Sequence, residues 1–188
     1  MKISKKYLNK SFWKNKTVLI TGINGFIGGN LSKQLLAYGC TVIGVTNRKN
    51  KSKFLHFEKI HSKVKISYTD ISNYEQISKI VKKNKIDICF HLAAQVDVNV
   101  ARHNPYQTFE SNIKGTYNLL EALRLNSKVK AIIVASSDKA YGEYSLKDLP
   151  YKETYDLRPR YPYDVSKAAA DMITKSYSTE LFNMPLIT

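Results

Sequence analysis

The chain has 188 residues, of which 43% are hydrophobic and 24% charged, and its formal net charge is +15. This length and composition are ordinary for one globular domain, so a single domain is expected. The sequence shows no run of about 18 apolar residues and no basic segment followed by an apolar one at its start, so neither a membrane span nor a secretory signal is predicted and a cytoplasmic protein is expected.

The net charge raises the question of nucleic-acid binding, because a basic surface attracts phosphates. Only five of the 30 basic residues are arginine, and the lysines are scattered along the chain rather than grouped with aromatic residues. We interpret the charge as a solvated lysine-rich surface and expect no nucleic-acid partner. Cys40 and Cys89 lack a CxxC neighbour and the four histidines lack ligand spacing, so buried reduced thiols are expected and a metal site is not.

A strand, a glycine-rich turn and a helix are predicted early in the chain. An apolar run leads into TGINGFIG at 21–28, and a helical pattern then continues to about residue 38. Gly22 permits the tight turn, Gly25 lets the backbone approach a pyrophosphate, and Gly28 lets the helix pack closely on the strand. The spacing is GxxGxxG and not GxGxxG, but its place between strand and helix predicts a dinucleotide-binding turn. The candidate cofactor-binding residues of this turn are Gly22, Asn24, Gly25, Phe26, Ile27 and Gly28.

The end of the second strand bears on the choice of cofactor. This strand is predicted over residues 41–45 and is followed by Thr46-Asn47-Arg48. In dinucleotide-binding folds an Asp or Glu at this place accepts hydrogen bonds from the ribose hydroxyls of NAD. No acid is present here to repel a 2′-phosphate, and Arg48 has the charge to pair with one. NAD or NADP is therefore expected, with NADP modestly favoured, and Asn47 and Arg48 are expected to contact it.

The middle of the chain continues the alternation of strands and helices. Residues 49–62 are basic and are interpreted as irregular, and a third strand is predicted at 64–68. Asp70, with Ile71 beside it, follows this strand and is expected at the adenine end of the cofactor. Ser72 and Glu75 predict a capping box for the next helix.

A fourth strand is predicted at 86–92, apolar on both faces as an interior parallel strand should be. The small residues that follow it let a backbone pass close to a cofactor, and His91 at its end is interpreted as a hydrogen-bonded core histidine. The candidate cofactor-binding residues here are Leu92, Ala93, Ala94 and Gln95.

The second half of the chain contains two long helical patterns. Asn104-Pro105 predicts the start of a helix that reaches about Leu125 and contains Asn112, a further candidate for the cofactor site. A fifth strand at 130–135 runs directly into Ser136-Ser137-Asp138-Lys139. Tyr161-Pro162 predicts the start of a last helix, to about Phe182, and residues 186–188 begin a sixth strand.

Strands that alternate with helices throughout predict an α/β fold, a Rossmann-type doubly wound parallel sheet with helices on both faces. The expected domain covers residues 1–188 and ends inside the sixth strand. Ligands bind such folds outside the carboxyl ends of the strands, so the chemistry is expected there. The loop 142–160 is long enough to predict an active-site segment.

Tyr163 and Lys167 are four residues apart on the last predicted helix, so both side chains lie on one face. A lysine cation beside a phenol favours the phenolate, which can act as a base at neutral pH. Ser137 follows the fifth strand, and its hydroxyl can hydrogen-bond the same substrate oxygen. The alternative for Ser136 and Ser137 is ordinary loop and cap chemistry, which we accept for Ser136 only.

Six segments together resemble the extended short-chain dehydrogenase/reductase family of nucleotide-sugar epimerases and dehydratases. They are TGINGFIG, Asp70, HLAA at 91–94, SNIKGTYNLLEA at 111–122, SSDKAYG at 136–142 and YPYDVSK at 161–167. Within this family, Phe12-Trp13 and Ser137-Asp138-Lys139 look like the CDP-glucose 4,6-dehydratases. Sugar 4-epimerases usually have small or apolar residues in place of the Asp-Lys pair, so the resemblance favours a dehydratase.

The resemblance implies a role for each candidate catalytic residue. Tyr163 removes the proton of the sugar C4 hydroxyl, Ser137 polarises that oxygen, and Lys167 lowers the tyrosine pKa and holds the nicotinamide ribose. Asp138 protonates the departing C6 hydroxyl, and Lys139 is the candidate base at C5. The alternative for Asp138 and Lys139 is a solvent-exposed ion pair in a turn.

The resemblance also implies a nucleotide-sugar substrate, CDP-glucose or a similar compound, and a homodimer formed by the helices at 105–125 and 162–182 with Phe109, Tyr117 and Tyr177. Family members continue into a C-terminal region that binds the nucleotide of the substrate, and this region is absent here. Two other hypotheses therefore remain. One is a nucleotide-sugar 4-epimerase or reductase, and the other is a truncated, non-catalytic NAD(P)-binding module.

Overall fold

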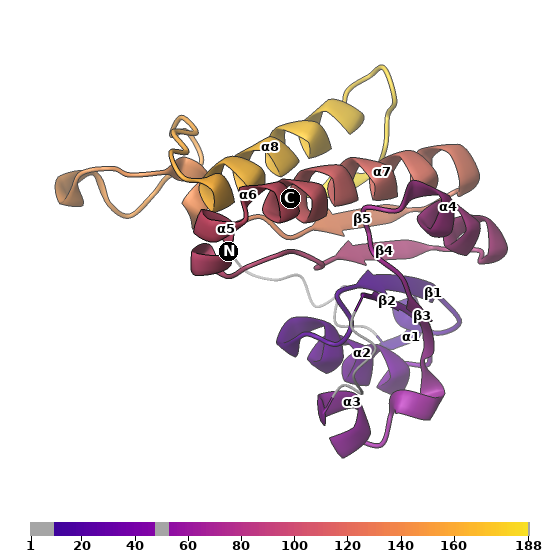
Figure 1. Cartoon of the computed structure of the whole chain (residues 1–188). Helices are drawn as coiled ribbons and strands as arrows, with labels where there is room; N and C mark the ends of the chain where they lie inside the picture. Colours follow the sequence, from indigo (N-terminus) through magenta and orange to yellow (C-terminus); the bar gives the residue numbers. More distant parts are fainter. Residues whose placement is uncertain (1–9, 48–52, 188) are drawn as a thin grey trace.

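The computed structural model describes residues 10–47 and 53–187. The described chain forms a six-stranded parallel sheet in the order β3-β2-β1-β4-β5-β6. This confirms the predicted doubly wound fold. Figure 1 labels strands β1 to β5 of this sheet. The strands are β1 Thr17–Thr21, β2 Thr41–Thr46, β3 Lys65–Tyr68, β4 Ile88–His91, β5 Ala131–Val134 and β6 Leu186–Ile187.

Helices cover both faces of the sheet (Figure 1). The helices on one face are α2 Phe26–Ala37 and α3 Lys53–Phe57, and those on the other are α4 Tyr74–Lys83, α7 Gly115–Asn126 and α8 Pro162–Tyr177. Short helices lie before β1 and after β4, namely α1 Lys10–Trp13, α5 Val98–His103 and α6 Pro105–Phe109. No helix in the described ranges is long and apolar enough to cross a membrane.

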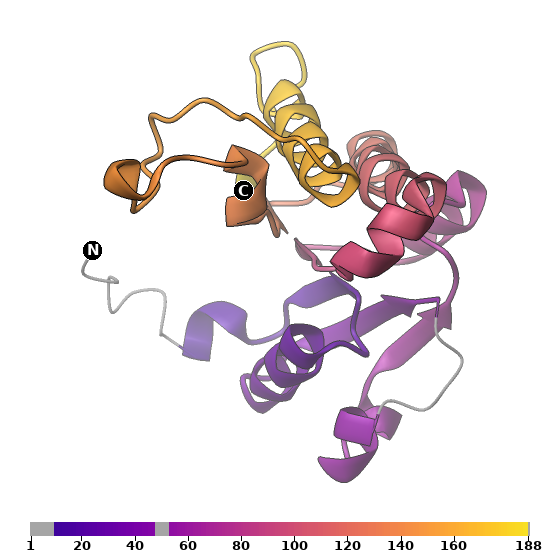
Figure 2. The same cartoon turned by 60° about the vertical axis from the view of Figure 1, so that its left-hand side comes forward.

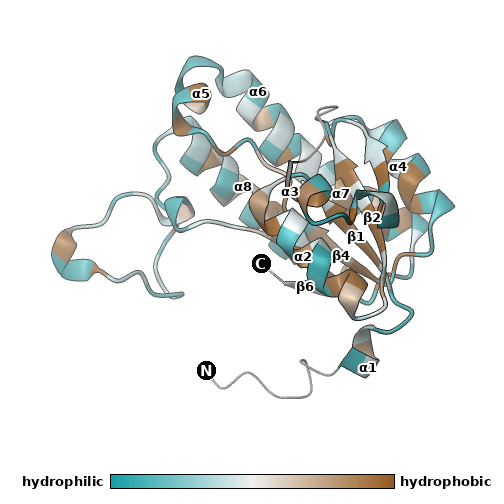
Figure 3. Ribbon diagram, turned by 90° about the horizontal axis from the view of Figure 1, so that it is seen from below, coloured by the Kyte–Doolittle hydropathy of each residue, from teal (hydrophilic) through white to brown (hydrophobic). Residues whose placement is uncertain are grey.

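A hydrophobic core lies on each face of the sheet, and β1 contributes to both. Leu19 packs in the cluster beneath α4 and α7, whereas its neighbours Val18 and Ile20 pack in the cluster beneath α2. All three side chains are fully buried. Figure 3 shows the result as apolar strands enclosed by helices with polar outer faces. A central parallel strand needs apolar side chains on both faces, and the continuous apolar run of β1 supplies them.

The strand order reverses between β1 and β4, which pair with Thr21 opposite His91. Chains that leave neighbouring strands in opposite directions at such a point open a crevice at the carboxyl edge of the sheet. The glycine turn after β1 and the segment after β4 meet at this edge. The fold therefore places the candidate site there.

The prediction of an irregular segment at 49–62 is wrong for its described part. Residues 53–57 form α3, and a 3₁₀ turn covers His61–Lys63. Leu55 is fully buried and Ile60 nearly so, both against the α2 face of the core. Burial of a few apolar side chains stabilises a helix here, although the many lysines make the helical spacing of those side chains hard to recognise in the sequence.

The capping residue of α4 also differs from the prediction. The N-cap is Asn73, whose side-chain oxygen accepts a hydrogen bond from Gln76 N at 3.0 Å. Ser72 donates its hydroxyl hydrogen to Asp70 Oδ1 instead, at 2.7 Å. The predicted capping box of Ser72 and Glu75 is therefore wrong by one residue, and the cap is an asparagine.

The helix predicted from Asn104 to about Leu125 is present, but its hydrogen-bond pattern changes midway. Asn104 caps α6 as predicted, by accepting from Gln107 N at 3.0 Å. Residues Glu110–Lys114 then form a π-helical turn before α7 begins. The short helix α5 was not predicted, and its N-cap is Asp97.

The last helix ends at Tyr177, not near Phe182 as predicted. The chain must reverse there to enter β6 parallel to β5. Phe182 folds back so that its ring lies 5.3 Å from that of Tyr177, and Met184 N donates to Tyr177 O. The predicted sixth strand is present at residues 186–187.

The segment between β5 and α8 projects from the body of the molecule as an arm, residues 142–160 (orange in Figure 2). Gly142 pairs with Arg158 at its base. Within the arm Tyr144 stacks on Tyr155 at a centroid distance of 4.8 Å, and Arg158 lies over the Tyr144 ring. Contacts between its own side chains therefore order this long loop.

Candidate active site

The glycine turn after β1 leaves no room for a side chain at its first glycine. Gly22 has a φ of +73°, and a Cβ there would lie 2.8 Å from Ala93 N and 2.9 Å from Leu92 O. A Cβ on Gly28 would lie 2.5 Å from Gly22 O. The turn therefore packs directly against both its own helix and the segment after β4. The glycine spacing predicted the tight turn and the close packing of the helix, but not the contact with the segment after β4.

The start of α2 fits an anionic ligand. Its N-cap is Gly25, and no side chain caps the first turn. The neighbouring side chains of Phe26 and Ile27 are 83% and 62% exposed, while that of Asn24 is half-buried. Backbone N–H groups at an uncapped helix start bind phosphate groups well, so these residues suit the pyrophosphate of a dinucleotide.

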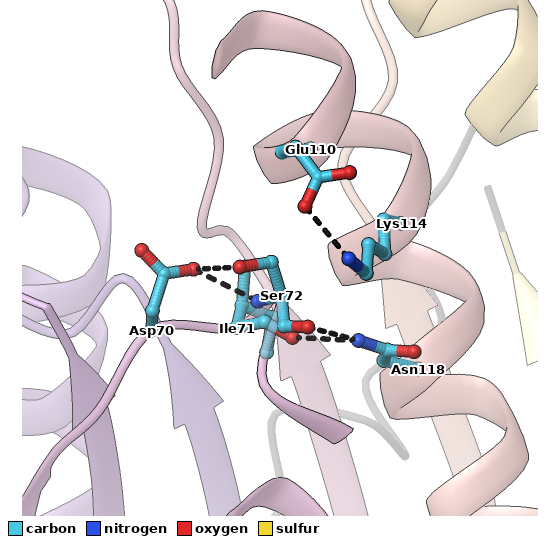
Figure 4. A network of polar contacts seen from close by, with 6 residues as sticks. All are labelled: Asp70, Ile71, Ser72, Glu110, Lys114 and Asn118. Carbon is cyan, nitrogen blue, oxygen red and sulfur yellow. Dashed lines mark hydrogen bonds and ion pairs between the residues drawn. The ribbon is translucent and has the colours of Figure 1, made fainter. Parts of the chain in front are cut away.

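The residues expected to contact the adenosine half follow β2 and β3. Asn47 is exposed just after β2. Arg48, on which the NADP expectation depends, lies outside the described residues. Asp70 is exposed after β3, with its Oδ1 accepting hydrogen bonds from Ser72 N at 2.8 Å and Ser72 Oγ, and Ile71 beside it is buried (Figure 4). Lys114, on the facing helix, is paired with Glu110 at 2.7 Å.

His91 is hydrogen-bonded at both ring nitrogens, as predicted for a core histidine. Thr21 Oγ1 lies 2.7 Å from its Nδ1, and Thr116 Oγ1 lies 3.0 Å from its Nε2. Thr21 Oγ1 also accepts hydrogen bonds from Leu92 N and Ala93 N, so its own hydrogen is free to go to Nδ1. Nδ1 is then the acceptor, and Nε2 carries the proton and donates to Thr116. This network holds the backbone that follows β4.

Asn112 lies in the π-helical turn and joins three parts of the site. Its Oδ1 accepts from Gln95 N at 2.7 Å, and its Nδ2 donates to Gln95 O at 3.0 Å and to Ser166 Oγ at 2.9 Å. Ser166 in turn donates to Tyr163 O. The Asn112 amide therefore holds the segment Leu92–Gln95, of which Ala93 and Ala94 are half-buried, against the turn of α8 that carries Tyr163.

Ser137, Asp138 and Lys139 lie directly after β5. Ser137 is half-buried and is the N-cap of a 3₁₀ turn, where its Oγ accepts from Lys139 N at 3.2 Å and donates to Asp138 Oδ1 at 3.1 Å. Asp138 and Lys139 are exposed. Among the described ion pairs there is none between these two side chains.

Helix α8 brings Tyr163 and Lys167 against this turn, since α8 packs on residues 138–141. Lys167 is buried, and its Nζ donates to Ala135 O at 2.5 Å, two residues before Ser137. Tyr163 is half-buried, and no hydrogen bond joins its phenol to a residue in the described ranges. The structure thus gathers the predicted catalytic residues from β5 and α8 at one edge of the sheet.

Burial controls the charges at the centre of the site. It lowers the pKa of the Lys167 ammonium below its ordinary value, an effect that the Asp171 carboxylate opposes. Burial, reinforced by the positive charge of Lys167, also lowers the pKa of His91 from 6.5 to about 3. His91 is therefore neutral at physiological pH, so it adds no positive charge beside Lys167.

Four residues that hold the site together were not singled out from the sequence, namely Thr21, Thr116, Asn118 and Ser166. All four are buried. Thr116 and Asn118 lie inside an apolar helical pattern, and buried polar residues there are a signal of specific hydrogen bonds. The sequence could have flagged them, but it does not identify their partners.

Comparison with known proteins adds to this geometry. A family model described as GDP-mannose 4,6 dehydratase matches residues 19–188. The chain is 35% identical over 177 residues to CDP-paratose 2-epimerase of Salmonella typhi, covering 86% of this chain and 52% of that protein. It is 28% identical over 177 residues to CDP-glucose 4,6-dehydratase of Salmonella typhimurium, covering 94% and 49%.

A solved structure shows the same fold. It is UDP-glucuronic acid 4-epimerase from Bacillus cereus in complex with UDP-glucuronic acid and NAD, with a TM-score of 0.78 and 27% identity over 91% of this chain and 55% of that one. The chain thus spans about half the length of the relatives that it matches. Fold, motifs and family model agree, and the chain belongs to the GDP-mannose 4,6 dehydratase family of nucleotide-sugar epimerases and dehydratases, within the extended short-chain dehydrogenases/reductases.

Proposed function

We propose that this chain is the cofactor-binding part of a nucleotide-sugar 4,6-dehydratase, with CDP-glucose or a similar compound as substrate. The observation that supports the proposal is the turn Ser137-Asp138-Lys139, which carries an exposed acid and an exposed amine and packs against α8, the helix of Tyr163 and Lys167. A 4,6-dehydratase needs such a pair in addition to the oxidation residues, because it must protonate one group and deprotonate another on the same sugar.

The proposed cofactor is NAD or NADP, held by the uncapped start of α2 and by the residues after β2, β3 and β4. The nicotinamide ring would reversibly accept hydride from the sugar and return it. The similar Bacillus cereus epimerase was solved in complex with NAD. Thr46-Asn47-Arg48 contains no acid that would repel a 2′-phosphate. We therefore expect this chain to bind NADP at least as well as NAD. A calorimetric titration should then show NADP binding at least as tightly as NAD, with Arg48→Ala reducing that preference, and a strong preference for NAD would contradict this.

The side chains divide the proposed reaction between them. Tyr163 accepts the proton of the C4 hydroxyl, with Lys167 one turn further along the same helix. Ser137 turns its hydrogen from Asp138 towards the sugar oxygen. When C4 is a ketone the C5 hydrogen is acidic, so Lys139 is the proposed base that removes it, and Asp138 is the proposed acid that donates a proton to the C6 hydroxyl. The C6–O bond breaks, water leaves and a C5–C6 double bond forms. Return of the hydride to C6, with a proton from solvent added at C5, would then complete the product.

The test is incubation of the chain with NAD or NADP and CDP-glucose in deuterated water, with UDP-glucose and GDP-mannose as parallel substrates. A dehydratase makes a product that has lost one water and gained a deuterium at C5, which mass spectrometry detects. A 4-epimerase makes an isomer of unchanged mass without solvent deuterium. That outcome would overturn the dehydratase and support the epimerase, which the 35% identity to CDP-paratose 2-epimerase keeps as the second candidate.

The same experiment also tests the hypothesis that the chain is a non-catalytic NAD(P)-binding module. Cofactor binding without reaction on any of the three nucleotide sugars would show that the chain by itself is a non-catalytic binding module. This outcome has a physical basis, because the chain spans about half the length of its relatives. It would overturn the proposed activity for this chain while leaving its cofactor site in place.

A further inference from the structure

Asn118 is an unusual residue for its place in the fold. It lies inside α7 with 4% of its surface exposed. Asparagine is unfavourable in a helix interior, and a buried amide without hydrogen bonds destabilises a fold further. A buried asparagine at such a position therefore needs partners outside its own helix.

Those partners are two carbonyl groups of the turn between β3 and α4. Asn118 Nδ2 donates to Ser72 O at 2.8 Å and approaches Ile71 O at 3.4 Å (Figure 4). One turn earlier in α7, Gly115 makes room for Ile71, since a Cβ on Gly115 would lie 2.4 Å from Ile71 Cγ2. Residues three apart share one face of a helix, so α7 holds this turn at two neighbouring points.

The same turn carries Asp70. Ser72 N and Ser72 Oγ both donate to Asp70 Oδ1, at 2.8 Å and 2.7 Å, and the carboxylate is exposed. Figure 4 shows the three residues side by side, with contacts from Asn118 to the Ser72 backbone and from Ser72 to Asp70. The orientation of the carboxylate thus depends on Ser72, and the position of Ser72 depends on Asn118.

We propose that Asn118 is a positioning residue for the adenine end of the nucleotide cofactor, acting through the turn Asp70–Ser72. This rests on the cofactor site of the proposed function. Asn112 lies in the π-helical turn that leads into α7 and holds the segment after β4. One continuous stretch of helix then sets the position of both halves of the cofactor site, with a different asparagine for each half.

The test compares the two halves of the cofactor as separate probes, 5′-AMP and nicotinamide mononucleotide. Asn118→Asp keeps the size of the side chain but replaces the donating amide nitrogen by an acceptor that faces two carbonyls. Affinity for 5′-AMP and for NAD should fall about tenfold, the effect of losing a buried hydrogen bond. Affinity for nicotinamide mononucleotide should stay within about twofold.

Asn126→Asp is the matched control. Asn126 lies on the same helix, and its Nδ2 donates to Ala122 O at 3.0 Å and Ser78 Oγ at 3.4 Å, away from the Asp70 turn. This variant should leave both affinities unchanged. If Asn118→Asp does not fold, the side-chain amide signals of Asn118 in the unmodified protein provide the readout by nuclear magnetic resonance. They should shift when 5′-AMP is added and not when nicotinamide mononucleotide is added.

Two results would overturn the proposal in different ways. Equal losses of affinity for 5′-AMP and nicotinamide mononucleotide, or Asn118 amide signals that do not shift with 5′-AMP, would show that Asn118 has only a structural role. The proposed cofactor site would not be affected by that result. Failure of the unmodified chain to bind 5′-AMP, NAD and NADP would instead overturn the cofactor site and Asn118's part in it together.

Discussion

At the scale of single residues, His91 links the site to the stability of the fold. The ring is buried and neutral, with a pKa lowered from 6.5 to about 3. In the unfolded chain the same group takes up a proton as the pH falls below 6.5. Because protons then favour the unfolded state, this contribution to stability is complete above about pH 6.5 and is lost as the pH falls towards 3.

We expect the free energy of unfolding to depend on pH, and we expect this dependence to be weaker in the variant His91→Gln. Between about pH 6.5 and 4, the unmodified chain should lose about 1.4 kcal/mol per pH unit more than this variant. Urea unfolding at several pH values measures the difference. His103→Gln, at an exposed histidine of α5, is the control and should keep the slope of the unmodified chain. Parallel slopes for the His91 variant and the unmodified chain would show that His91 titrates normally.

Gly22 can be tested by the same unfolding measurement. Gly22→Ala adds both an unfavourable φ and a Cβ within 2.9 Å of backbone atoms of Leu92 and Ala93. Gly39→Ala adds only the φ of +80°, since its nearest atom is Lys14 Cγ at 3.7 Å. Gly39→Ala should cost about 1–2 kcal/mol, and Gly22→Ala about 1–3 kcal/mol more. Equal losses of stability in the two variants would mean that the segment after β4 can move to accommodate a Cβ at residue 22.

Asp138 and Tyr163 separate the two stages of the proposed reaction. In enzyme that turns over, Tyr163→Phe removes the first base and should abolish every step. Asp138→Asn leaves oxidation at C4 intact, so 4-keto sugar or reduced cofactor should accumulate while elimination slows by about 10²- to 10⁴-fold. Rapid mixing with absorbance detection follows both stages. Ser136→Ala, at an exposed neighbour, should be neutral. Unchanged turnover by Asp138→Asn would favour the epimerase.

At the scale of elements, the start of α4 tests which residue caps it. Asn73→Ala removes the side-chain oxygen that accepts from Gln76 N, and it should lower the free energy of unfolding by about 1 kcal/mol. Glu75→Ala would remove the acceptor of the predicted capping box, but Glu75 has no part in the observed cap, so the effect should be within about 0.5 kcal/mol. Thermal or urea unfolding distinguishes the two, and the reverse order would restore Ser72 and Glu75 as the cap.

At the scale of the whole molecule, we propose that the outer faces of α7 and α8 form a homodimer interface. Tyr117 is 39% exposed and Met172 63% exposed. Phe109 is half-buried, and Tyr177 donates to Glu121 within the chain, so these two have less surface to offer a partner. Two helices from each subunit can form a four-helix contact across a twofold axis.

Light scattering should give the mass of a dimer for the unmodified chain. Met172→Lys with Tyr117→Lys should give a monomer, because two lysine charges would be desolvated at the contact. Leu146→Lys, on the arm and 88% exposed, is the control and should leave the dimer intact. A monomer mass for the unmodified chain over a wide concentration range would overturn the interface.

Local sequence determined much of this protein. Apolar runs predicted the strands, glycine spacing predicted the turn at Gly22, and Asn104-Pro105 predicted the start of α6. Each of these signals acts within a few residues, through steric limits on the backbone or through a cap. The approximate place of the candidate site follows from them, because the carboxyl ends of parallel strands meet at one edge.

Tertiary structure decided the contacts that join distant residues. Thr21 with His91, Asn112 with Ser166 and Asn118 with Ser72 are 70, 54 and 46 residues apart. Periodicity shows that such residues face inward but not which groups they meet, because the partner depends on how helices pack on the sheet. Tertiary structure also decided the cap of α4 and the π-helical turn. Moving a helix start or a turn by one residue changes the local helix propensity little, so burial and long-range hydrogen bonds determine its position.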